Sequence, residues 1–142
     1  MKLGRIEHVD PRTYWKNEAH DFTPPKQSWV AFSAGKPGFS DNGSFGWEEG
    51  PVLRAELYID TGDKQRNKQA FDALAARKDE IELAFGEPLI WTRRDDIKAS
   101  RIYVKKLGAV TDDEGVLREH RDWLVDRLFR IREVFAPRIK EL

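Results

Sequence analysis

Residues 53–85 constrain the fold most, because a half-buried strand passes there into a long amphipathic helix. Over residues 52–59 apolar and polar side chains alternate, a pattern typical of a strand with one face in the core. The inward set is Leu53, Ala55, Leu57 and Ile59, and the outward set is Arg54, Glu56, Tyr58 and Asp60.

The sequence Asp-Thr-Gly-Asp at residues 60–63 predicts the joint between this strand and the helix. Its side-chain oxygens can accept hydrogen bonds from the free backbone N–H groups of a first helical turn. We expect the helix over residues 64–85 and its end at Gly86 and Pro88. The apolar stripe of the helix is Phe71, Leu74, Ile81 and Phe85.

Further segments complete the predicted order. Residues 29–34, 89–93 and 100–107 are predicted strands, and Asp95-Asp96 predicts a turn between the last two. The Gly-, Ser-, Asn- and Pro-rich residues 35–50 predict a loop. Residues 111–114 predict a capping box for a second helix that runs to about Phe135, before Pro137.

This order of strand, strand, helix, strand, strand, helix predicts an α+β fold. An antiparallel four-stranded sheet would carry two long helices on one face and leave its other face open. We expect residues 28–142 to form this single domain and residues 1–27 to form an N-terminal arm. At 142 residues, the chain is long enough for one core.

The charge balance and the lack of cysteine exclude several classes of protein. With 25 basic and 25 acidic residues, no net field draws the whole chain to nucleic acid or to a membrane. Without cysteine, disulfides, thiolate catalysis and Cys-based zinc sites are excluded. No apolar run has the length of a membrane span, so we expect a cytoplasmic protein without membrane contact. We expect no cofactor.

Three motifs carry a family resemblance: Leu57-Tyr58-Ile59-Asp60, Gly86-Glu87-Pro88-Leu89-Ile90-Trp91 and Ala99-Ser100-Arg101-Ile102. Together with Trp123-Leu124, they resemble the bacterial domain-of-unknown-function family numbered 4268, over about residues 28–140. The resemblance implies the fold and its boundaries, and it implies no activity.

Members of that family often form the C-terminal part of longer proteins that resemble restriction endonucleases. Gly4-Arg5-Ile6-Glu7 and residues 15–24 look like the opening of such a nuclease part. The chain then passes almost directly into the C-terminal domain, without the acidic strands that would hold a metal ion. The resemblance therefore does not extend to nuclease activity.

The open face of the predicted sheet combines aromatic and basic side chains. Rings interleaved with Arg and Lys can stack bases and hold phosphates, although cross-strand ion pairs on a solvated face also explain this pattern. We predict a binding or interaction domain, accessory to a nucleic-acid-processing or defence system, that acts through this face. Its candidate binding residues are Arg54, Tyr58, Trp91, Arg93, Arg101, Tyr103 and Lys105.

The partner and the presence of catalysis stay open at this point. A protein partner or self-association as a homodimer is one expectation, and nucleic acid is another. The alternative function is a diverged metal-dependent nucleic-acid enzyme that uses the carboxylates of Glu56, Asp60 and Asp63. Helix capping also explains the turn at residues 60–63, and therefore we favour a binding domain without a metal over an enzyme.

Overall fold

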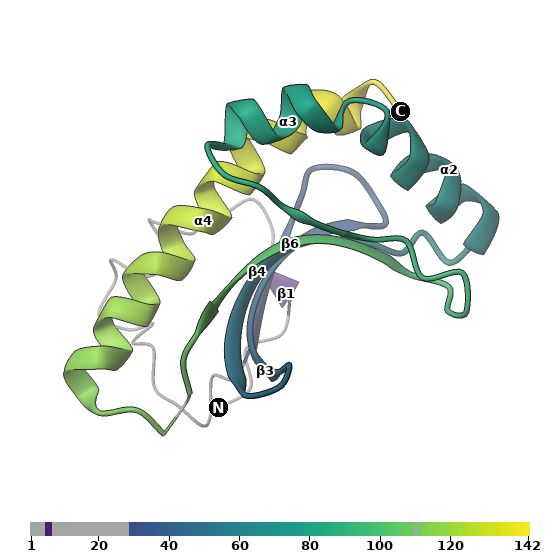
Figure 1. The fold of residues 1–142 in the computed structure, drawn as a ribbon. Coiled ribbons are helices and arrows are strands. Elements are labelled where there is room, and N and C mark those ends of the chain that lie inside the picture. The colour runs from purple at the N-terminus through teal and green to yellow at the C-terminus, as the bar shows by residue number, and fades with distance from the viewer. Residues whose placement is uncertain (1–4, 7–28, 110) are drawn as a thin grey trace.

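The computed structural model describes residues 5–6, 29–109 and 111–142, and these contain one mixed sheet and the helices that cover it (Figure 1). The six strands are ordered β1-β2-β3-β4-β6-β5 across the sheet. They are β1 (Arg5–Ile6), β2 (Trp29–Ser33), β3 (Phe39–Trp47), β4 (Pro51–Ile59), β5 (Ile90–Thr92) and β6 (Ser100–Leu107). Apart from β1, the predicted arm of residues 1–27 lies outside the described residues.

The described helices are α2 (Lys64–Ala75), α3 (Lys78–Phe85) and α4 (Glu114–Lys140). Figure 1 shows them on the same face of the sheet, along the outer side of its curve. α2 packs on β4 and β6, α4 packs on β3 and β4, and α3 lies against α4. No helix in the described part of the chain combines the length and the apolar character needed to cross a membrane.

Strand β4 forms the centre of the core. Its predicted inward set, from Leu53 to Ile59 at every second position, is 0% exposed, which confirms the alternation that the sequence predicts. α4 covers the helix-facing side of the sheet and contributes the buried side chains of Leu124, Leu128, Ile131 and Phe135 to the core. The predicted α+β class is therefore confirmed, with helices layered on one face of the sheet.

The number of strands differs from the predicted four. The sheet has five antiparallel strands, and the two-residue β1 extends it by pairing with β2 in parallel. The main error lies at residues 39–47, which were expected to belong to a loop and form β3 instead. Pairing with both β2 and β4 outweighs the weak strand propensity of this segment. Gly43 serves packing there, because a Cβ at this position would lie 3.0 Å from Leu128 Cδ1 of α4.

The lengths of the helices also differ from the prediction. The single helix expected over residues 64–85 is divided into α2 and α3 at a tight turn, in which the Arg77 amide donates to the Leu74 carbonyl. The second helix continues through Pro137 instead of ending before it. The last turn of α4 buries Ile139, which is 1% exposed, and that burial offsets the hydrogen bond that Pro137 cannot make.

The predicted joint at residues 60–63 and the predicted helix end at Gly86 are confirmed, whereas the N-cap of α4 is Asp113 and not Thr111, the first residue of the predicted capping box. Asp63 caps α2 by accepting hydrogen bonds from the backbone N–H groups of Gln65 and Arg66. Asp113 caps α4 in the same way through the N–H of Val116. Gly86 ends α3 at a φ of 97°, a left-handed conformation that favours glycine.

An acidic side chain lies in the core at Asp41 of β3, which is 1% exposed. It is paired in register with Phe32 and Leu57, whose side chains point toward the helices. Neither of its carboxyl oxygens has a hydrogen-bond partner in the described part of the structure. Burial raises the pKa of Asp41 to about 7, and the positive charge of Arg132 opposes part of that rise.

This pKa predicts that stability falls as the pH rises from about 4 to about 7. In that interval the unfolded chain releases the Asp41 proton while the folded chain retains it. A difference of roughly three pKa units corresponds to about 4 kcal/mol. Urea denaturation across this range should show the wild type losing stability relative to Asp41→Asn, which has no proton to release. Parallel stability curves for the two proteins would contradict the assignment.

Candidate functional site

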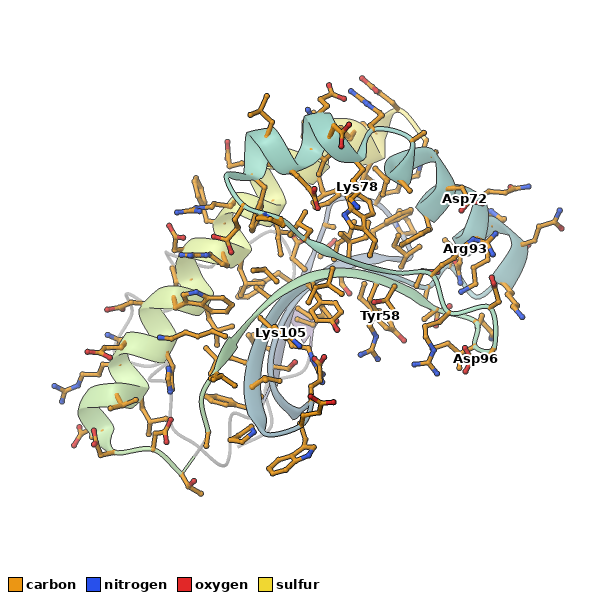
Figure 2. The ribbon with its side chains drawn as sticks, in the orientation of Figure 1. Tyr58, Asp72, Lys78, Arg93, Asp96 and Lys105 are labelled. Carbon is orange, nitrogen blue, oxygen red and sulfur yellow. The ribbon has the colours of Figure 1, made fainter. Side chains whose placement is uncertain are left out.

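The open face of the sheet is defined by Arg54 and Tyr58 of β4 and by Arg101, Tyr103 and Lys105 of β6. The register pairs Arg54 with Lys105 and Tyr58 with Arg101, so the members of each pair project on the same side. The intervening β4 residues point into the core, which places these side chains on the face away from the helices. Figure 2 shows Tyr58 and Lys105 on that side.

Each tyrosine of the open face has an arginine over its ring. Arg101 Cζ lies 5.4 Å from the centroid of the Tyr58 ring. Arg54 Cζ lies 5.9 Å from the centroid of the Tyr103 ring. A guanidinium at this range is attracted by the electron-rich face of the ring, while its N–H groups remain able to bind an anion. The open face therefore combines flat aromatic surface with positive charge.

Glu48, in the turn between β3 and β4, reaches across to this surface. Its Oε2 accepts a hydrogen bond from Arg54 Nε at 2.7 Å, and its Oε1 accepts one from Lys105 Nζ at 3.2 Å. The Tyr103 hydroxyl also donates to Oε1, at 3.2 Å. Burial raises the pKa of Glu48, but the hydrogen bonds from Arg54 and Lys105 outweigh it and hold the pKa below its usual value. Glu48 is therefore held as an anion.

Gly46 of β3 leaves the space in which the Arg54 guanidinium lies. A Cβ at position 46 would be 2.8 Å from Arg54 Nη1 and 2.9 Å from its Cζ. No side chain larger than hydrogen fits there while Arg54 keeps this position. The glycine therefore determines where the Arg54 guanidinium lies, and with it the contact to Glu48.

Glu56 of β4 is the buried acid of this face, with 5% of its surface exposed. Burial raises its pKa, and the positive charges of Arg101 and Arg54 oppose the rise. Arg101 Nη1 lies 3.9 Å from Glu56 Oε2, which has no hydrogen-bond partner among the residues that the structure describes. Together with Glu48, this weak acid balances part of the charge of Arg54, Arg101 and Lys105.

The structure places two of the seven candidate residues, Trp91 and Arg93, on the helix side of the sheet and away from the open face. Trp91 pairs in register with Ile102, whose side chain is in the core. The Trp91 Nε1–H donates to Glu82 Oε2 at 3.0 Å, and its ring lies 6.0 Å from the ring of Phe71. The sequence does not reveal this placement, because β5 is a short edge strand. The face to which its side chains point depends on the register of its pairing with β6.

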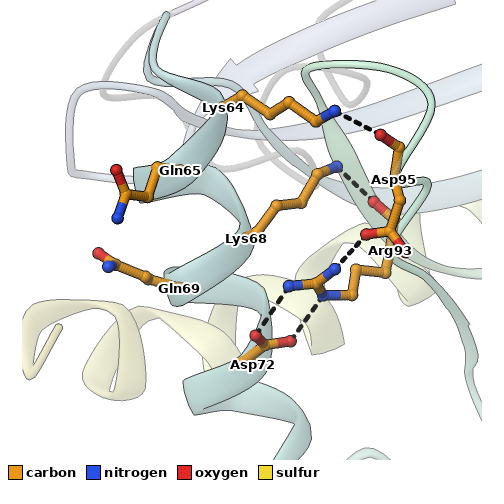
Figure 3. Close-up of a pocket in the computed structure, with 7 residues that line it drawn as sticks. All are labelled: Lys64, Gln65, Lys68, Gln69, Asp72, Arg93 and Asp95. Atoms are coloured by element: carbon orange, nitrogen blue, oxygen red, sulfur yellow. Dashed lines mark hydrogen bonds and ion pairs between the residues drawn. The ribbon is translucent and has the colours of Figure 1, made fainter.

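Arg93 lines a pocket between α2 and the β5–β6 turn, shown in Figure 3. Arg93 Nε and Nη2 donate to the two carboxylate oxygens of Asp72 at 2.9 and 3.1 Å, and Arg93 also pairs with Asp95. Lys64 donates to the Asp95 carbonyl. The full lining is Lys64, Gln65, Lys68, Gln69, Asp72, Arg93 and Asp95. Lys64 and Arg93 of this pocket thus already have hydrogen-bond partners within the protein.

Lys68 is the buried cation of this pocket, at 6% exposure. Its ammonium donates to the Ala99 carbonyl at 2.8 Å, to the Ser100 hydroxyl at 2.9 Å and to the Arg93 carbonyl. Burial lowers the pKa of Lys68. Because an ammonium has three N–H donors, these acceptors satisfy it completely, and Lys68 joins α2 to the β5–β6 turn as a structural contact.

The three carboxylates of the enzyme alternative have separate environments. Asp63 caps α2, and Asp60 Oδ1 accepts hydrogen bonds from the Gly62 N–H at 3.0 Å and from Asn67 Nδ2 at 3.2 Å. Glu56 lies on the open face beside Arg101. In residues 5–6, 29–109 and 111–142, no group of three or more acidic or histidine side chains is placed to hold a metal ion.

Sequence reasoning missed Glu48 and Gly46, since both fall in the segment that was expected to be a loop. The spacing of Phe39 and Phe45, which an even number of positions places on one face of a strand, was the available signal. A strand there predicts a hairpin to β4, which would have placed Gly46 and Glu48 beside Arg54.

The model of one protein family, described as a domain of unknown function (DUF4268), matches residues 7–139. This match confirms the resemblance found in the sequence. Neither the curated proteins nor the solved structures contain a match. Because the description of the family names no activity, the function has to be inferred from the open face.

Gly46→Ala is expected to displace the Arg54 guanidinium and to leave the fold intact, because the added methyl meets only the end of a flexible side chain. The Arg54 Nε–H signal in NMR spectra should lose the shift that its bond to Glu48 produces. Gly43→Ala is the contrasting variant, since its methyl would press on Leu128 in the core and lower the melting temperature. An unchanged Arg54 signal in Gly46→Ala would contradict the packing described.

Lys68→Met is expected to lower the free energy of unfolding by about 2 to 3 kcal/mol, because it removes three hydrogen bonds and leaves the Ala99 carbonyl without the Lys68 donor. The Arg93 carbonyl keeps the hydrogen bond that the Ser100 hydroxyl donates to it, at 2.8 Å. Lys78→Met, at the exposed start of α3, is the matched control and should change stability by less than about 0.5 kcal/mol. Urea denaturation measures both. Equal effects of the two substitutions would show that Lys68 is not a structural contact.

Proposed function

The chain belongs to the DUF4268 family, and we propose that it is a non-catalytic binding domain whose open face holds single-stranded nucleic acid. The observation that carries the proposal is the pairing of Tyr58 with Arg101 and of Tyr103 with Arg54 on one side of adjacent strands. Such a domain would serve as an accessory to a nucleic-acid-processing or defence system.

The arrangement of the two rings supports a ligand with unpaired bases. Tyr103 lies opposite Glu56 and Tyr58 lies opposite Arg101, so the tyrosines are diagonal neighbours across the β4–β6 pair. Diagonal positions on adjacent strands are about 7–8 Å apart, within reach of long aromatic side chains. Two bases of one extended strand could each stack on one ring, whereas the bases of a duplex are already stacked on each other.

The basic side chains support binding of the phosphates of that strand. Arg54, Arg101 and Lys105 come from the same two strands as the rings, so positive charge lies beside the stacking surface. The whole chain has no net charge, with 25 basic and 25 acidic residues. Attraction to a polyanion must therefore be local, and the open face supplies such a local concentration of charge.

A protein partner is the second candidate, favoured by two exposed apolar side chains at one end of the sheet. Trp47 is 73% exposed and Leu107 is 75% exposed. They flank the start of β4, where Trp47 pairs with Pro51 and Leu107 pairs with Val52. If this end of the sheet mediates self-association, Trp47→Ser will convert a homodimer to a monomer in light scattering.

The enzyme alternative has its own test. Cleavage of DNA or RNA that requires Mg²⁺ or Mn²⁺ and is lost in Asp60→Ala would overturn the proposal of a purely binding function. Asp60 is a suitable target because its carboxylate contacts Gly62 and Asn67 rather than any residue of the open face.

The proposal predicts that Tyr58→Ala and Tyr103→Ala each weaken binding of a labelled single strand by about fivefold or more. Stacking of one base on an aromatic side chain is worth about 1–3 kcal/mol. Fluorescence anisotropy with an oligonucleotide of about twelve nucleotides, within the length that one small domain covers, measures the effect.

Two neighbouring lysines provide the matched control for charge. Lys105 lies on the open face, opposite Arg54, whereas Lys106 lies opposite Leu53 and therefore on the other face. Lys105→Ala should weaken binding and reduce the dependence of log K on log salt by about one, and Lys106→Ala should do neither. Equal effects of the two substitutions, or no binding by the wild type, would refute the proposal.

A further inference from the structure

We propose that the Glu48 carboxylate occupies a phosphate subsite of the open face, so that the β3–β4 turn is a built-in competitor that a phosphate of the ligand displaces. This inference rests on the proposed function for the identity of the ligand. The subsite itself is defined by its donors, which are Arg54 Nε, the Tyr103 hydroxyl and Lys105 Nζ.

The donor set fits a phosphate group. The donors come from two adjacent strands and converge on one carboxylate, with distances of 2.7, 3.2 and 3.2 Å to its oxygens. Arg54 contacts one oxygen, while Tyr103 and Lys105 share the other. Two cations and a hydroxyl around a single anion are the types of side chain that bind phosphate oxygens in nucleic-acid complexes.

Glu48 differs from its donors in its place in the fold. The donors project from the middle of the sheet, whereas Glu48 belongs to the turn, where its N–H donates to the Gly50 carbonyl at 2.8 Å. The turn includes Glu49 at a φ of 55° and Gly50 at a φ of 141°. Rotation of the Glu48 side chain would free all three donors while the register of β3 and β4 stays unchanged.

The position of Arg54 shows that the subsite is shaped by the fold. Its guanidinium lies over Gly46, where a Cβ would be 2.8 Å from Nη1, and over the Tyr103 ring at 5.9 Å. Backbone on one side and a ring on the other restrict where the guanidinium can lie. Arg54 therefore stays in place to receive a phosphate when Glu48 leaves.

The turn also supplies the matched control, because Glu49 carries the same charge at the next position. Glu49 is exposed, and the structure shows no hydrogen bond or ion pair from its side chain in the described part of the chain. Glu48→Gln and Glu49→Gln therefore remove the same charge from the same turn, and only the first substitution alters the contact with the donors.

Titration with inorganic phosphate, followed by the NMR signal of Arg54 Nε–H, tests the subsite directly. We expect Glu48→Gln to bind phosphate at least about fivefold more tightly than wild type, and Glu49→Gln to stay within about twofold of it. Glu48→Ala should behave like Glu48→Gln. Adding Arg54→Gln should abolish the gain, and because this variant has no Arg54 Nε–H, the backbone N–H signal of Tyr103 reports its titration. Equal affinity in the Glu48 and Glu49 variants would overturn the inference.

The same variants with the labelled oligonucleotide separate the two proposals. If the wild type binds the strand and Glu48→Gln binds it no more tightly than Glu49→Gln, the open face is the binding site and the competitor role of Glu48 is refuted. If no variant binds the strand but Glu48→Gln gains affinity for phosphate, the subsite stands and the nucleic-acid function is refuted. A gain for both ligands, confined to the Glu48 variants, is the expected result.

Discussion

The rest of the structure depends on the burial of every second residue of β4. Leu53, Ala55, Leu57 and Ile59 are 0% exposed beneath α2 and α4, and a shift of one residue would turn all of them toward the opposite face. That constraint sets the register of β4 with β3 and β6. The same register places Arg54, Tyr58 and their β6 neighbours together on the open face, so the packing of one face determines the chemistry of the other.

The buried and partly buried charged side chains differ in how completely hydrogen bonds satisfy them. Lys68 has three acceptors for its three N–H groups, and it therefore stabilises the joint between α2 and the sheet. The carboxyl oxygens of Asp41 have no hydrogen-bond partner in the described structure. Burial therefore favours the protonated form of Asp41 and raises its pKa to about 7. Glu48 is the intermediate case, because its carboxylate is only partly buried and is bound by Arg54 and Lys105 at the surface of the open face, which is the basis of the proposal that a phosphate replaces it.

The errors in the sequence analysis have a common physical cause. The loop expected at residues 35–50, the single helix over 64–85 and the helix end before Pro137 were all inferred from local composition. In each case contacts distant in sequence decided the outcome: pairing on both edges of β3, packing of α3 on α4, and burial of Ile139. Local propensities span about 0.7 kcal/mol per residue in helices and about 1 kcal/mol in strands for ordinary side chains, and about 3 kcal/mol for a proline in a helix, which tertiary packing can outweigh.

The sequence by itself determined the alternation of β4, the strand-to-helix joint at residues 60–63, the helix end at Gly86, the α+β class and the resemblance to its family. These follow from periodicity and from contacts between near neighbours in the chain. Only the tertiary structure decided that Trp91 and Arg93 lie on the helix side, and that Glu48 reaches Arg54, Tyr103 and Lys105. The reason is register: whether two side chains meet across a sheet depends on strand pairing and turn geometry, which are set by the packing of the whole domain.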